Sequence, residues 1–348
     1  MFRQFGATPA GERLQRLHTS PLYNGKSLQN PSSFGSDEMG SFLTMLKEML
    51  LGREQRTPLT PVQTAEFDTH AFAERDSNGV RIVWIGHSTV LIEMDGFRIL
   101  TDPVFSKRCS PTSLMGPVRF HEVNIPDDLL RTLDVVLISH DHFDHLDMPT
   151  IEKLAELDVP FVVPLGVGAH LESWGVPTTR IREHVWWETA SFAEGALEFV
   201  CTPARHFSGR GFTRNQTLWA SWVIRTNARS IYFSGDSGYF EGFKEIGEKF
   251  GPFELTMIEM AAYHEELWPS VHMWPEQAVQ AHMDLRGEMM LPIHWGTFNL
   301  AFHAWDEPAE RLLKAAAAAD VRVATPRPGQ LMYVEYGPIT EPWWREAK

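Results

Sequence analysis

The sequence predicts one large α/β domain in which layered strands are covered by helices. Apolar runs typical of strands gather early, where RIVWIG, TVLIEM, FRILTD and DVVLIS follow one another closely. Strand-like runs then alternate with stretches typical of amphipathic helices, such as PEQAVQAHM and PAERLLKAAAAA. From Val80 onward no break rich in proline and glycine is long enough to separate two domains. These three observations favour a single core.

Further strands are expected where short apolar runs recur later in the chain. They lie at PFVVP, LEFVCTP, TLWASWVIRT, SIYFSG, LTMIEM and MMLPIH, and two more helices at IEKLAEL and GYFEGFKEIGEKF. The MDG between the second and third early strands predicts a hairpin turn.

The composition is that of an acidic globular protein. Hydrophobic residues make up 43% of the 348 residues and charged residues 22%, which excludes a disordered or fibrous chain. The formal net charge is -14, so long-range electrostatics repel phosphate backbones and disfavour nucleic acid as a partner. Bound cations would still reverse this field locally for an anionic substrate.

Cysteine usage points to a reducing compartment. Cys109 and Cys201 are too few for a disulfide framework and are not spaced as a thiolate metal site. The N-terminal residues lack the apolar core of a signal peptide, and no run approaches the length of a membrane span. We therefore expect a cytoplasmic protein without an integral membrane segment, and the sequence leaves its oligomeric state open.

The chain divides into an N-terminal extension over residues 1–75 and a main domain over residues 76–348. The extension is rich in Ser, Asn, Pro and Gly but contains one amphipathic patch, SFLTMLKEMLLG. Ser41 is expected to cap this helix and Gly52 to end it in the left-handed conformation. We expect the helix to pack on the protein body, and peripheral contact with a membrane is the functional alternative. Its apolar residues recur at helical spacing at Phe42, Met45, Leu46, Met49 and Leu50.

The most informative segment is DVVLISHDHFDHLDMP, in which an apolar strand runs directly into a polar cluster. A buried strand cannot continue through His140, His142, Asp144 and His145, so the chain delivers imidazoles and a carboxylate to the strand's end, where α/β sheets expose their sites. Imidazole with carboxylate and no thiolate suits zinc, iron or manganese in an open catalytic site. The alternative is a polar loop whose histidines only form hydrogen bonds, but random clusters rarely place an Asp between two pairs.

This cluster resembles the H-x-H-x-D-H motif of the metallo-β-lactamase superfamily. The family's other ligand positions follow in order as His206 in TPARHF, Asp236 in FSGDSGY and His294 in PIHWGTF. A single strand-ending histidine is more often structural, but four motifs in the right order support one another. The resemblance implies a four-layer αββα sandwich.

The resemblance also implies a binuclear metal centre. Two cations close together lower the pKa of a shared water enough to give hydroxide near neutral pH, and they stabilise charge on the substrate oxygens. Zinc is the first expectation, with manganese or iron as alternatives, because availability decides metal identity as much as ligands do. Asp144 and Asp236 are expected to act in catalysis as well as in metal binding. The resemblance assigns His140, His142 and His206 to one metal, Asp144, His145 and His294 to the other, and Asp236 to the bridging position.

Within the superfamily the chain is most similar to the N-acyl-phosphatidylethanolamine-hydrolysing phospholipase D group and its bacterial relatives. The similarity covers roughly residues 80–335, through WIGHSTVLIEMDGFRILTDPVFS, ISHDHFDHLD, FVVPLG, FSGDSGY, EIGEKFGPF and IHWGTF. It implies hydrolysis of a phosphodiester, with a lipid-like or small-molecule substrate. Where the group carries a Tyr, Glu, Pro, Arg stretch, this chain has AAYHEELWPS and lacks that arginine.

The same resemblance places His87 and Asp102 near the metals and matches His272 to a histidine of that group. Asp102, in TDPVF, is expected behind or beside the ligands with a role in catalysis, or else in a local turn hydrogen bond before Pro103. His272 precedes a helix that starts at Pro275 and is expected to orient substrate or to protonate the leaving alkoxide. Its alternative is a structural histidine whose ring is satisfied by water.

Three side chains are candidates for substrate contact. His87 lies in GHST, Tyr263 in AAYHEELWPS and Trp295 in IHWGTF. For the aromatic residues the alternative is core packing, because aromatic side chains supply much of the burial energy of α/β domains.

Three functional hypotheses remain open at this point. The first is phosphodiester hydrolysis, and the second is lactone or carboxylic ester hydrolysis, since the same hydroxide attacks a carbonyl. The third is a non-catalytic metal-binding sensor or scaffold, which would be expected to have lost ligands that this chain retains. Acidic charge and the short interval between His206 and Asp236 disfavour a nuclease, and no flavin-binding segment supports redox work.

Overall fold

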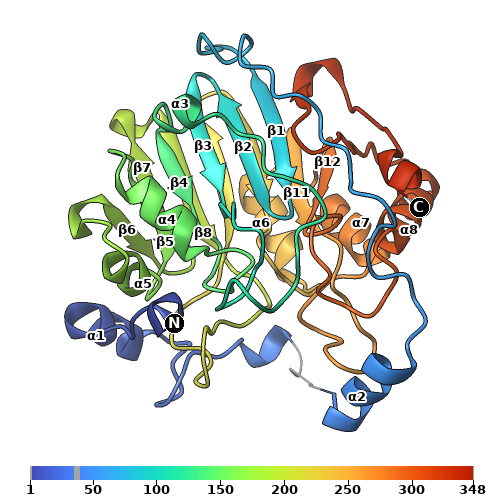
Figure 1. The fold of residues 1–348 in the computed structure, drawn as a ribbon. Coiled ribbons are helices and arrows are strands. Elements are labelled where there is room, and N and C mark those ends of the chain that lie inside the picture. The colour runs from blue at the N-terminus through green and yellow to red at the C-terminus, as the bar shows by residue number, and fades with distance from the viewer. Residues whose placement is uncertain (1, 35–39, 348) are drawn as a thin grey trace.

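The computed structural model describes residues 2–34 and 40–347, and the side chains of Phe2 and Phe42 lie outside the described part. Two mixed β-sheets pack face to face, and helices cover the outer face of each (Figure 1). The strand and helix order of the sequence therefore produces the expected four-layer αββα sandwich.

The first sheet combines an antiparallel and a parallel half. Its order is β13-β1-β2-β3-β4-β5-β6, antiparallel from β13 to β3 and parallel from β3 to β6. The expected hairpin joins β2 to β3, with Met94 opposite Phe97. The strands are β1 (Val80–Gly86), β2 (Thr89–Met94), β3 (Phe97–Thr101), β4 (Val135–Leu137), β5 (Phe161–Pro164), β6 (Ile181–His184) and β13 (Leu331–Tyr333).

The second sheet has the order β12-β11-β10-β9-β8-β7. Strands β7 to β10 pair in antiparallel fashion, and β10, β11 and β12 run parallel. The strands are β7 (Thr189–Phe192), β8 (Leu197–Thr202), β9 (Ser221–Thr226), β10 (Ser230–Phe233), β11 (Leu255–Glu259) and β12 (Met290–Ile293).

Helices flank both sheets and also occur in the extension. The main helices are α3 (Asp127–Leu130), α4 (Met148–Ala155) and α5 (Gly168–Ser173) beside the first sheet, and α6 (Gly242–Phe250), α7 (Pro275–Asp284) and α8 (Glu307–Ala319) beside the second. The extension holds α1 (Gly11–Thr19) and α2 (Phe42–Leu51). Short 3₁₀ helices span Phe2–Phe5, Ser32–Phe34, Thr178–Arg180, Ala193–Gly195, Val334–Tyr336 and Trp343–Ala347.

Alternation along the strands sorts side chains into two cores. On β1, Val83 belongs to a cluster with Ile151 of α4, while Trp84 belongs to the cluster that holds Phe199 and Trp222 of the second sheet. Because successive side chains of a strand point to opposite faces, β1 contributes both to the helix–sheet layer and to the sheet–sheet layer. The continuous burial of the strand runs reflects this two-sided packing.

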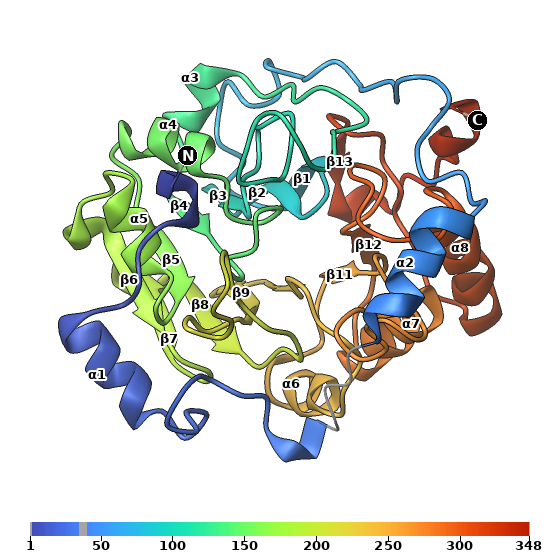
Figure 2. The same cartoon turned by 60° about the horizontal axis from the view of Figure 1, so that its bottom comes forward.

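The carboxyl ends of several strands meet at one edge of the sandwich. Strands β1, β3 and β4 of the first sheet share one direction, as do β8, β10, β11 and β12 of the second. This edge comes forward in Figure 2, where loops from both sheets surround it. It is the position at which α/β sheets expose binding sites.

The extension packs partly on its own main domain. Arg13 of α1 forms ion pairs with Glu172 and Glu183, and the backbone N–H of Ala7 donates to His170 Nδ1 at 3.1 Å. Helix α1 was not predicted, because GERLQRLHT alternates charges and apolar residues without a clear stripe.

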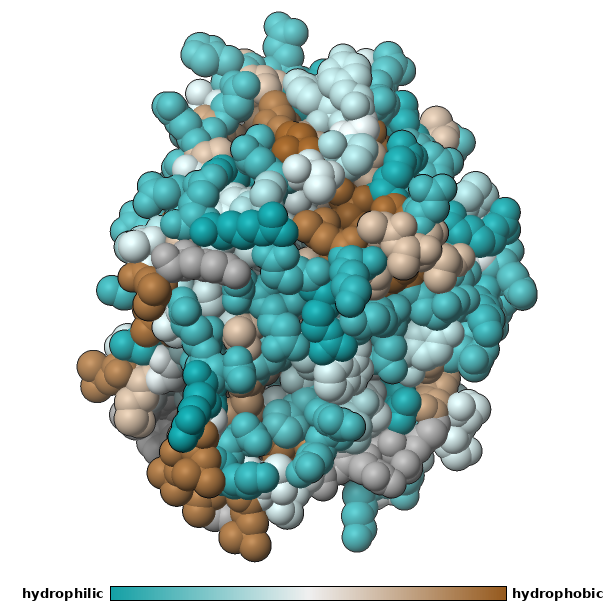
Figure 3. Space-filling view, turned by 90° about the vertical axis from the view of Figure 1, so that its right-hand side faces the viewer, coloured by the Kyte–Doolittle hydropathy of each residue, from teal (hydrophilic) through white to brown (hydrophobic). Residues whose placement is uncertain are grey.

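Helix α2 forms where it was expected, but most of its described apolar side chains are exposed. The Ser41 side chain accepts from the Thr44 N–H, which is the predicted cap, whereas Gly52 has φ of -59° and not the predicted left-handed conformation. Leu43 and Leu50 are 74% and 72% exposed, so the expectation of a helix packed on the body was wrong. Figure 3 shows hydrophobic side chains gathered at the lower end of the molecule, where α2 lies. Among the described residues, no helix combines the length and the apolar character needed to cross a membrane.

Candidate metal centre

Seven side chains predicted as metal ligands converge at the strand-end edge. The loop after β4 carries four of them, and the segments after β8, β10 and β12 carry one each. Each strand is buried up to its end, so the polar residue that follows is the first that can turn toward the space between the sheets. The seven residues are His140, His142, Asp144, His145, His206, Asp236 and His294.

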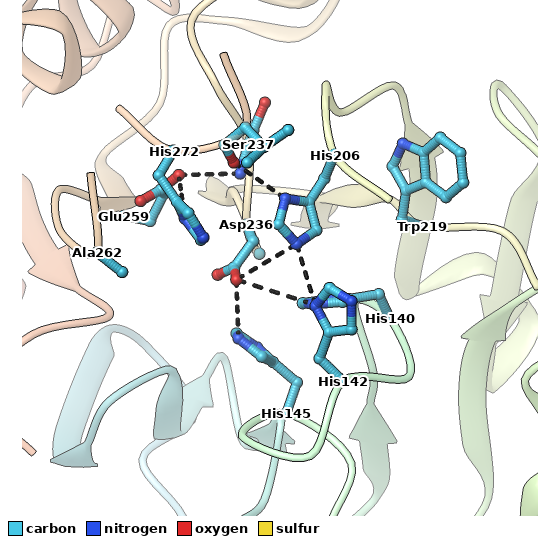
Figure 4. Close-up of polar contacts among 12 residues, drawn as sticks. His140, His142, His145, His206, Trp219, Asp236, Ser237, Glu259, Ala262 and His272 are labelled. Atoms are coloured by element: carbon cyan, nitrogen blue, oxygen red, sulfur yellow. Dashed lines mark hydrogen bonds and ion pairs between the residues drawn. The ribbon is translucent and has the colours of Figure 1, made fainter. Parts of the chain in front are cut away.

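The first ligand group consists of His140, His142, His206 and Asp236, whose ligand atoms all lie within 4.8 Å of one another (Figure 4). His142 Nδ1 is 2.9 Å from His140 Nε2 and 3.2 Å from His206 Nε2. Three imidazole nitrogens that face one point are arranged to share a cation.

The second ligand group consists of His87, Asp144, His145 and His294, again within 4.8 Å. Asp144 Oδ2 lies 2.9 Å from His87 Nε2, 3.3 Å from His294 Nε2 and 3.4 Å from His145 Nε2. One carboxylate thus faces three histidines, a mixed nitrogen and oxygen set suited to a divalent transition metal.

Asp236 lies between the two groups. Its Oδ2 is 3.0 Å from His294 Nε2 and 3.1 Å from His145 Nε2 on one side. On the other side it is 3.7 Å from His206 Nε2 and 3.8 Å from His140 Nε2. A single carboxylate oxygen therefore faces both groups, which is the bridging position that the resemblance implied.

The backbone turn before Asp236 requires glycine. Gly235 has φ of +54°, and a Cβ there would lie 2.5 Å from Ser139 Cβ in the loop that carries the other ligands. The absence of a side chain lets the β10 turn approach the β4 loop closely. His87, Asp102 and His294 also adopt positive φ, at 56°, 33° and 65°. Such strain is typical of functional sites held by surrounding structure.

Burial and charge set different protonation states in the two groups. Burial lowers the pKa of the His140, His142 and His206 imidazoles, so they are neutral and present lone pairs. Burial also opposes charge on His145 and His294, but the carboxylates of Asp236 and Asp144 outweigh it and raise both pKa values, that of His294 to about 10. Two protons balance the two carboxylates there, and a divalent cation is able to replace them.

Several ligand atoms are buried without a hydrogen-bond partner. His145 Nε2 and His294 Nε2 form no hydrogen bond although they lie within ion-pair distance of Asp236 Oδ2, and Asp236 Oδ1 has no hydrogen-bond partner among the described residues. Buried polar atoms in proteins are almost always hydrogen-bonded. Buried ligand-type atoms that converge without such bonds therefore fit the role of metal ligands.

Asp102 supports the centre from behind and does not reach the substrate side. It is fully buried, its Oδ2 is 2.7 Å from His145 Nδ1, and its Oδ1 accepts the Ser139 N–H at 2.7 Å. A carboxylate on the outer nitrogen of a histidine fixes the tautomer and orientation of the ring. Asp102 thus lies behind the ligands, one of the positions expected from the resemblance, where it acts as a positioning residue and not as one that touches substrate.

His87 lies beside the ligand groups, as the resemblance implied, but it does not reach the substrate side. It was predicted to contact substrate, but it is 1% exposed, and its Nε2 faces Asp144 inside the second ligand group. Burial, together with His294, lowers its pKa to about 3, so its imidazole is neutral. His87 is therefore a candidate ligand or ligand-positioning residue.

Tyr263 and Trp295 do not stand at the substrate side either. The Tyr263 hydroxyl donates to Glu307 at 2.9 Å, and its ring stacks on Trp274. Trp295 is buried, stacks on Trp84 and donates its indole N–H to the Pro292 carbonyl. Core packing, the alternative interpretation, describes both.

His272 faces the candidate centre together with a carboxylate that the sequence did not reveal. His272 Nδ1 is 3.4 Å from Glu259 Oε1 (Figure 4). The His272 ring lies 5.0 Å from the His294 ring. Glu259 ends β11, is fully buried, and accepts the N–H groups of Ser237 and Met273. Burial raises the pKa of Glu259. An acidic residue at the end of the apolar run LTMIE was the available signal.

Asp141 is a second residue that was missed, although it stands inside the motif. It is buried, and its carboxylate accepts the Gly209 N–H at 2.7 Å and the Thr217 hydroxyl at 2.8 Å. His170 Nε2 lies 3.2 Å from the same carboxylate. Asp141 therefore anchors the ligand loop to the segment that follows His206.

A cavity of about 220 Å³ opens onto both ligand groups. Its lining combines ligands and His272 with the apolar side chains of Phe207, Trp268 and Leu300. A substrate with a polar reacting group and an apolar part fits such a surface.

Comparison with known proteins agrees with this picture. Residues 97–295 match a family model described as the beta-lactamase superfamily domain. The chain is 45% identical to an uncharacterized protein of Mycobacterium tuberculosis, over 94% of this chain and 88% of that one. It is 33% identical to N-acyl-phosphatidylethanolamine-hydrolyzing phospholipase D 1 of Caenorhabditis elegans, over 84% and 87% of the two chains. Igni18, a metallo hydrolase of the archaeon Ignicoccus hospitalis, aligns with a TM-score of 0.57 at 24% identity, over 74% of this chain and 98% of that one.

The family match and the hydrolase relatives, together with the clustered ligand-type side chains, indicate a metal-dependent hydrolase. The chain belongs to the metallo-β-lactamase superfamily and lies near the N-acyl-phosphatidylethanolamine-hydrolysing phospholipase D group.

Proposed function

We propose that this protein hydrolyses a phosphodiester with two divalent cations held by the two ligand groups. The observation that carries the proposal is the position of Asp236 Oδ2 between both groups, within 3.8 Å of four histidine nitrogens. When bound, such a pair supplies Lewis acidity to the phosphoryl oxygens and lowers the pKa of a water held between the cations. Zinc is the first candidate, and manganese or iron fit the same ligands.

The chain's own residues would orient the reactants and handle the proton of the leaving group. Neutral imidazoles in the first group offer lone pairs, and Asp102 holds the ring of His145 in one orientation. His272 lines the cavity and is oriented by Glu259. We assign it the donation of a proton to the departing alkoxide oxygen.

A lipid-like substrate is the favoured class. The relative from Caenorhabditis elegans is named for hydrolysis of N-acyl-phosphatidylethanolamine, and the cavity wall of Phe207, Trp268 and Leu300 offers apolar contact. The exposed apolar residues of α2 would place the protein at a lipid surface.

The free, buried cysteines Cys109 and Cys201 fit the reducing cytoplasm expected from the sequence.

Lactone or carboxylic ester hydrolysis is the second candidate. The cavity that opens on the ligand groups has no Lys or Arg in its described lining, so a neutral carbonyl compound meets no charge mismatch there. The same centre attacks either kind of bond, and activity therefore has to decide between them.

The test compares the variants Asp236→Asn and His142→Ala with the wild type, with metal content measured in each. Bis-p-nitrophenyl phosphate, N-acyl-phosphatidylethanolamine and small lactones form the substrate panel, after loading with Zn, Mn or Fe. We expect both variants to lose metal and at least 100-fold in diesterase activity, on the order of the loss of a metal ligand. The exposed Asp158→Asn and His70→Ala serve as matched controls that keep full activity.

The outcomes separate the hypotheses. Wild-type-like diesterase activity in both site variants contradicts the proposal, and turnover of lactones alone favours the ester hydrolase. Metal binding without turnover of any substrate favours a sensor or scaffold. Within the same panel, His272→Gln should slow esters of aliphatic alcohols more than p-nitrophenyl esters, because only the poor leaving group needs the proton.

A further inference from the structure

We propose that Arg56 of the N-terminal extension forms an anion-recognition subsite beside the candidate metal centre and selects substrates that carry negative charge. This inference rests on the proposed hydrolase function and adds a specificity-determining residue to it. Nothing in the sequence motifs pointed to Arg56, which lies outside the main domain.

Arg56 stands next to the reaction cavity in space. It lines a second, small cavity together with Ala262, His294 and Leu300. The same three residues line the cavity that opens on the ligand groups. The two cavities therefore lie side by side, and His294, one of the residues that line both, is a candidate metal ligand.

The guanidinium of Arg56 is held in place without being neutralised. Its Nη2 donates to the Glu48 carbonyl at the end of α2 at 2.7 Å, and its central carbon lies 4.5 Å over the ring of Phe302. In the described part of the chain no carboxylate comes within ion-pair distance of Arg56, and its other nitrogen donors have no protein acceptor. An arginine stacked on an aromatic ring and fixed at one nitrogen is preorganised to bind an anion with the rest of its donors.

The positive charge of Arg56 lies beside a cavity that is otherwise lined by acidic and uncharged side chains and histidines. The lining of the reaction cavity carries the carboxylates of Asp144 and Asp236, and the protein as a whole has a net charge of -14. Among the described residues that line the two cavities, Arg56 is the one lysine or arginine. An anionic substrate thus meets positive charge only from bound cations and from this side chain, and the planar guanidinium matches phosphate or carboxylate oxygens.

The test uses the metal-loaded full chain and a matched substrate pair. Methyl p-nitrophenyl phosphate carries one negative charge, and dimethyl p-nitrophenyl phosphate is its neutral counterpart with the same leaving group. Arg56→Gln is expected to lower kcat/KM for the anionic diester about ten-fold, mainly through KM, as loss of one exposed charge-assisted contact would. The neutral triester should change less than about two-fold. Arg56→Lys should recover part of the loss.

A matched control removes the same charge from the same segment. Arg53 is exposed and lines neither cavity, so Arg53→Gln should leave both substrates unchanged. Equal losses for the charged and neutral substrates in Arg56→Gln would show that Arg56 only supports the end of α2 and would overturn the proposal. An unchanged kcat/KM for the diester would overturn it as well.

A binding measurement separates this proposal from the proposed function. The affinities of diethyl phosphate and neutral triethyl phosphate are measured by calorimetry for the metal-loaded wild type and Arg56→Gln. If the wild type hydrolyses no diester, the proposed function fails, and the calorimetry still decides the role of Arg56. About ten-fold weaker binding of diethyl phosphate alone supports the subsite, and equal binding in both proteins contradicts it.

Discussion

Asp236 is the residue that connects the two ligand groups of the candidate centre. Burial opposes its charge, but His145 and His294 hold its pKa well below the usual range of a carboxyl group. The carboxylate therefore stays charged, and the cluster balances it with protons on these histidines as long as no cation is present.

This balance predicts that metal binding depends on pH. In the metal-free protein the raised pKa values of His145 and His294, the latter about 10, keep both imidazoles protonated at pH 7. A cation that binds them has to displace protons, so affinity should rise with pH and fall as the solution is acidified. Calorimetric titration with Zn²⁺ in buffers of different ionisation enthalpy should show release of roughly one to two protons.

The contrary outcome is well defined. An apparent binding enthalpy that is independent of the buffer would mean that no proton leaves, and the assignment of the second ligand group would then be wrong. His70→Ala, which removes an exposed histidine, should release as many protons as the wild type.

At this scale the sequence located the side chains that end buried strands, because a polar residue after an apolar run is visible in the sequence itself. It did not locate Asp141, Glu259 or Arg56 as site residues. Their partners, such as Gly209, lie far along the chain, and only the folded structure brings them together. The predicted substrate contacts of Tyr263, Trp295 and His87 were wrong because a motif indicates proximity to the centre but not which side of it a ring occupies.

Among the elements, strand β2 carries a buried carboxylate that links it to both neighbouring strands, β1 and β3. Glu93 of β2 pairs in register with Arg81 of β1 and Arg98 of β3, and it forms ion pairs with both guanidinium groups. All three side chains are at least nine-tenths buried. The carboxylate also accepts the Asp76 N–H at 2.6 Å, so it joins the segment that leads into β1 to the sheet.

We expect Glu93→Ala to lower the free energy of unfolding by about 3–5 kcal/mol, since it leaves two buried guanidinium groups unpaired. Urea unfolding monitored by circular dichroism measures this. Glu198→Ala breaks the half-exposed pair with Arg225 and should cost only about 0–1 kcal/mol. Similar losses for the two variants would contradict the assigned role of the buried cluster.

The elements found from the sequence were those with long apolar runs or a clear helical stripe. Strands β6, β7 and β13 were not predicted, because IREH, TASF and LMY are short and the first two are largely polar. They lie at sheet edges, where pairing with a neighbour and not hydrophobic content defines the strand. Their backbone hydrogen bonds could not be foreseen from local sequence.

At the scale of the whole molecule, the extension presents an apolar surface that the main domain does not cover. Leu43, Met49 and Leu50 of α2 are each more than 60% exposed. We expect the protein to sediment with phosphatidylcholine vesicles, and the triple substitution of these residues by Gln to abolish this. Zwitterionic lipid suits the net charge of -14, which anionic vesicles would repel.

The control for this prediction is Leu59→Gln, which removes an equally exposed leucine outside α2. It should bind vesicles as the wild type does. Hydrolysis of a small water-soluble diester should be unchanged in the triple variant, because α2 contributes no residue to the ligand groups. Vesicle binding retained by the triple variant would exclude α2 as the contact.

Each sheet supplies only part of the ligand set, with the β4 loop on one side and the β8, β10 and β12 segments on the other. A cation bound there would add a link between two halves that otherwise meet through side-chain packing and a few hydrogen bonds, such as that from the Ala220 N–H to the Ser139 carbonyl. Release of the cation would weaken the contact between the two sheets before it weakened the strand pairing within either sheet. The melting temperature should therefore rise with free metal concentration, so that it reports the fraction of the sites that metal occupies.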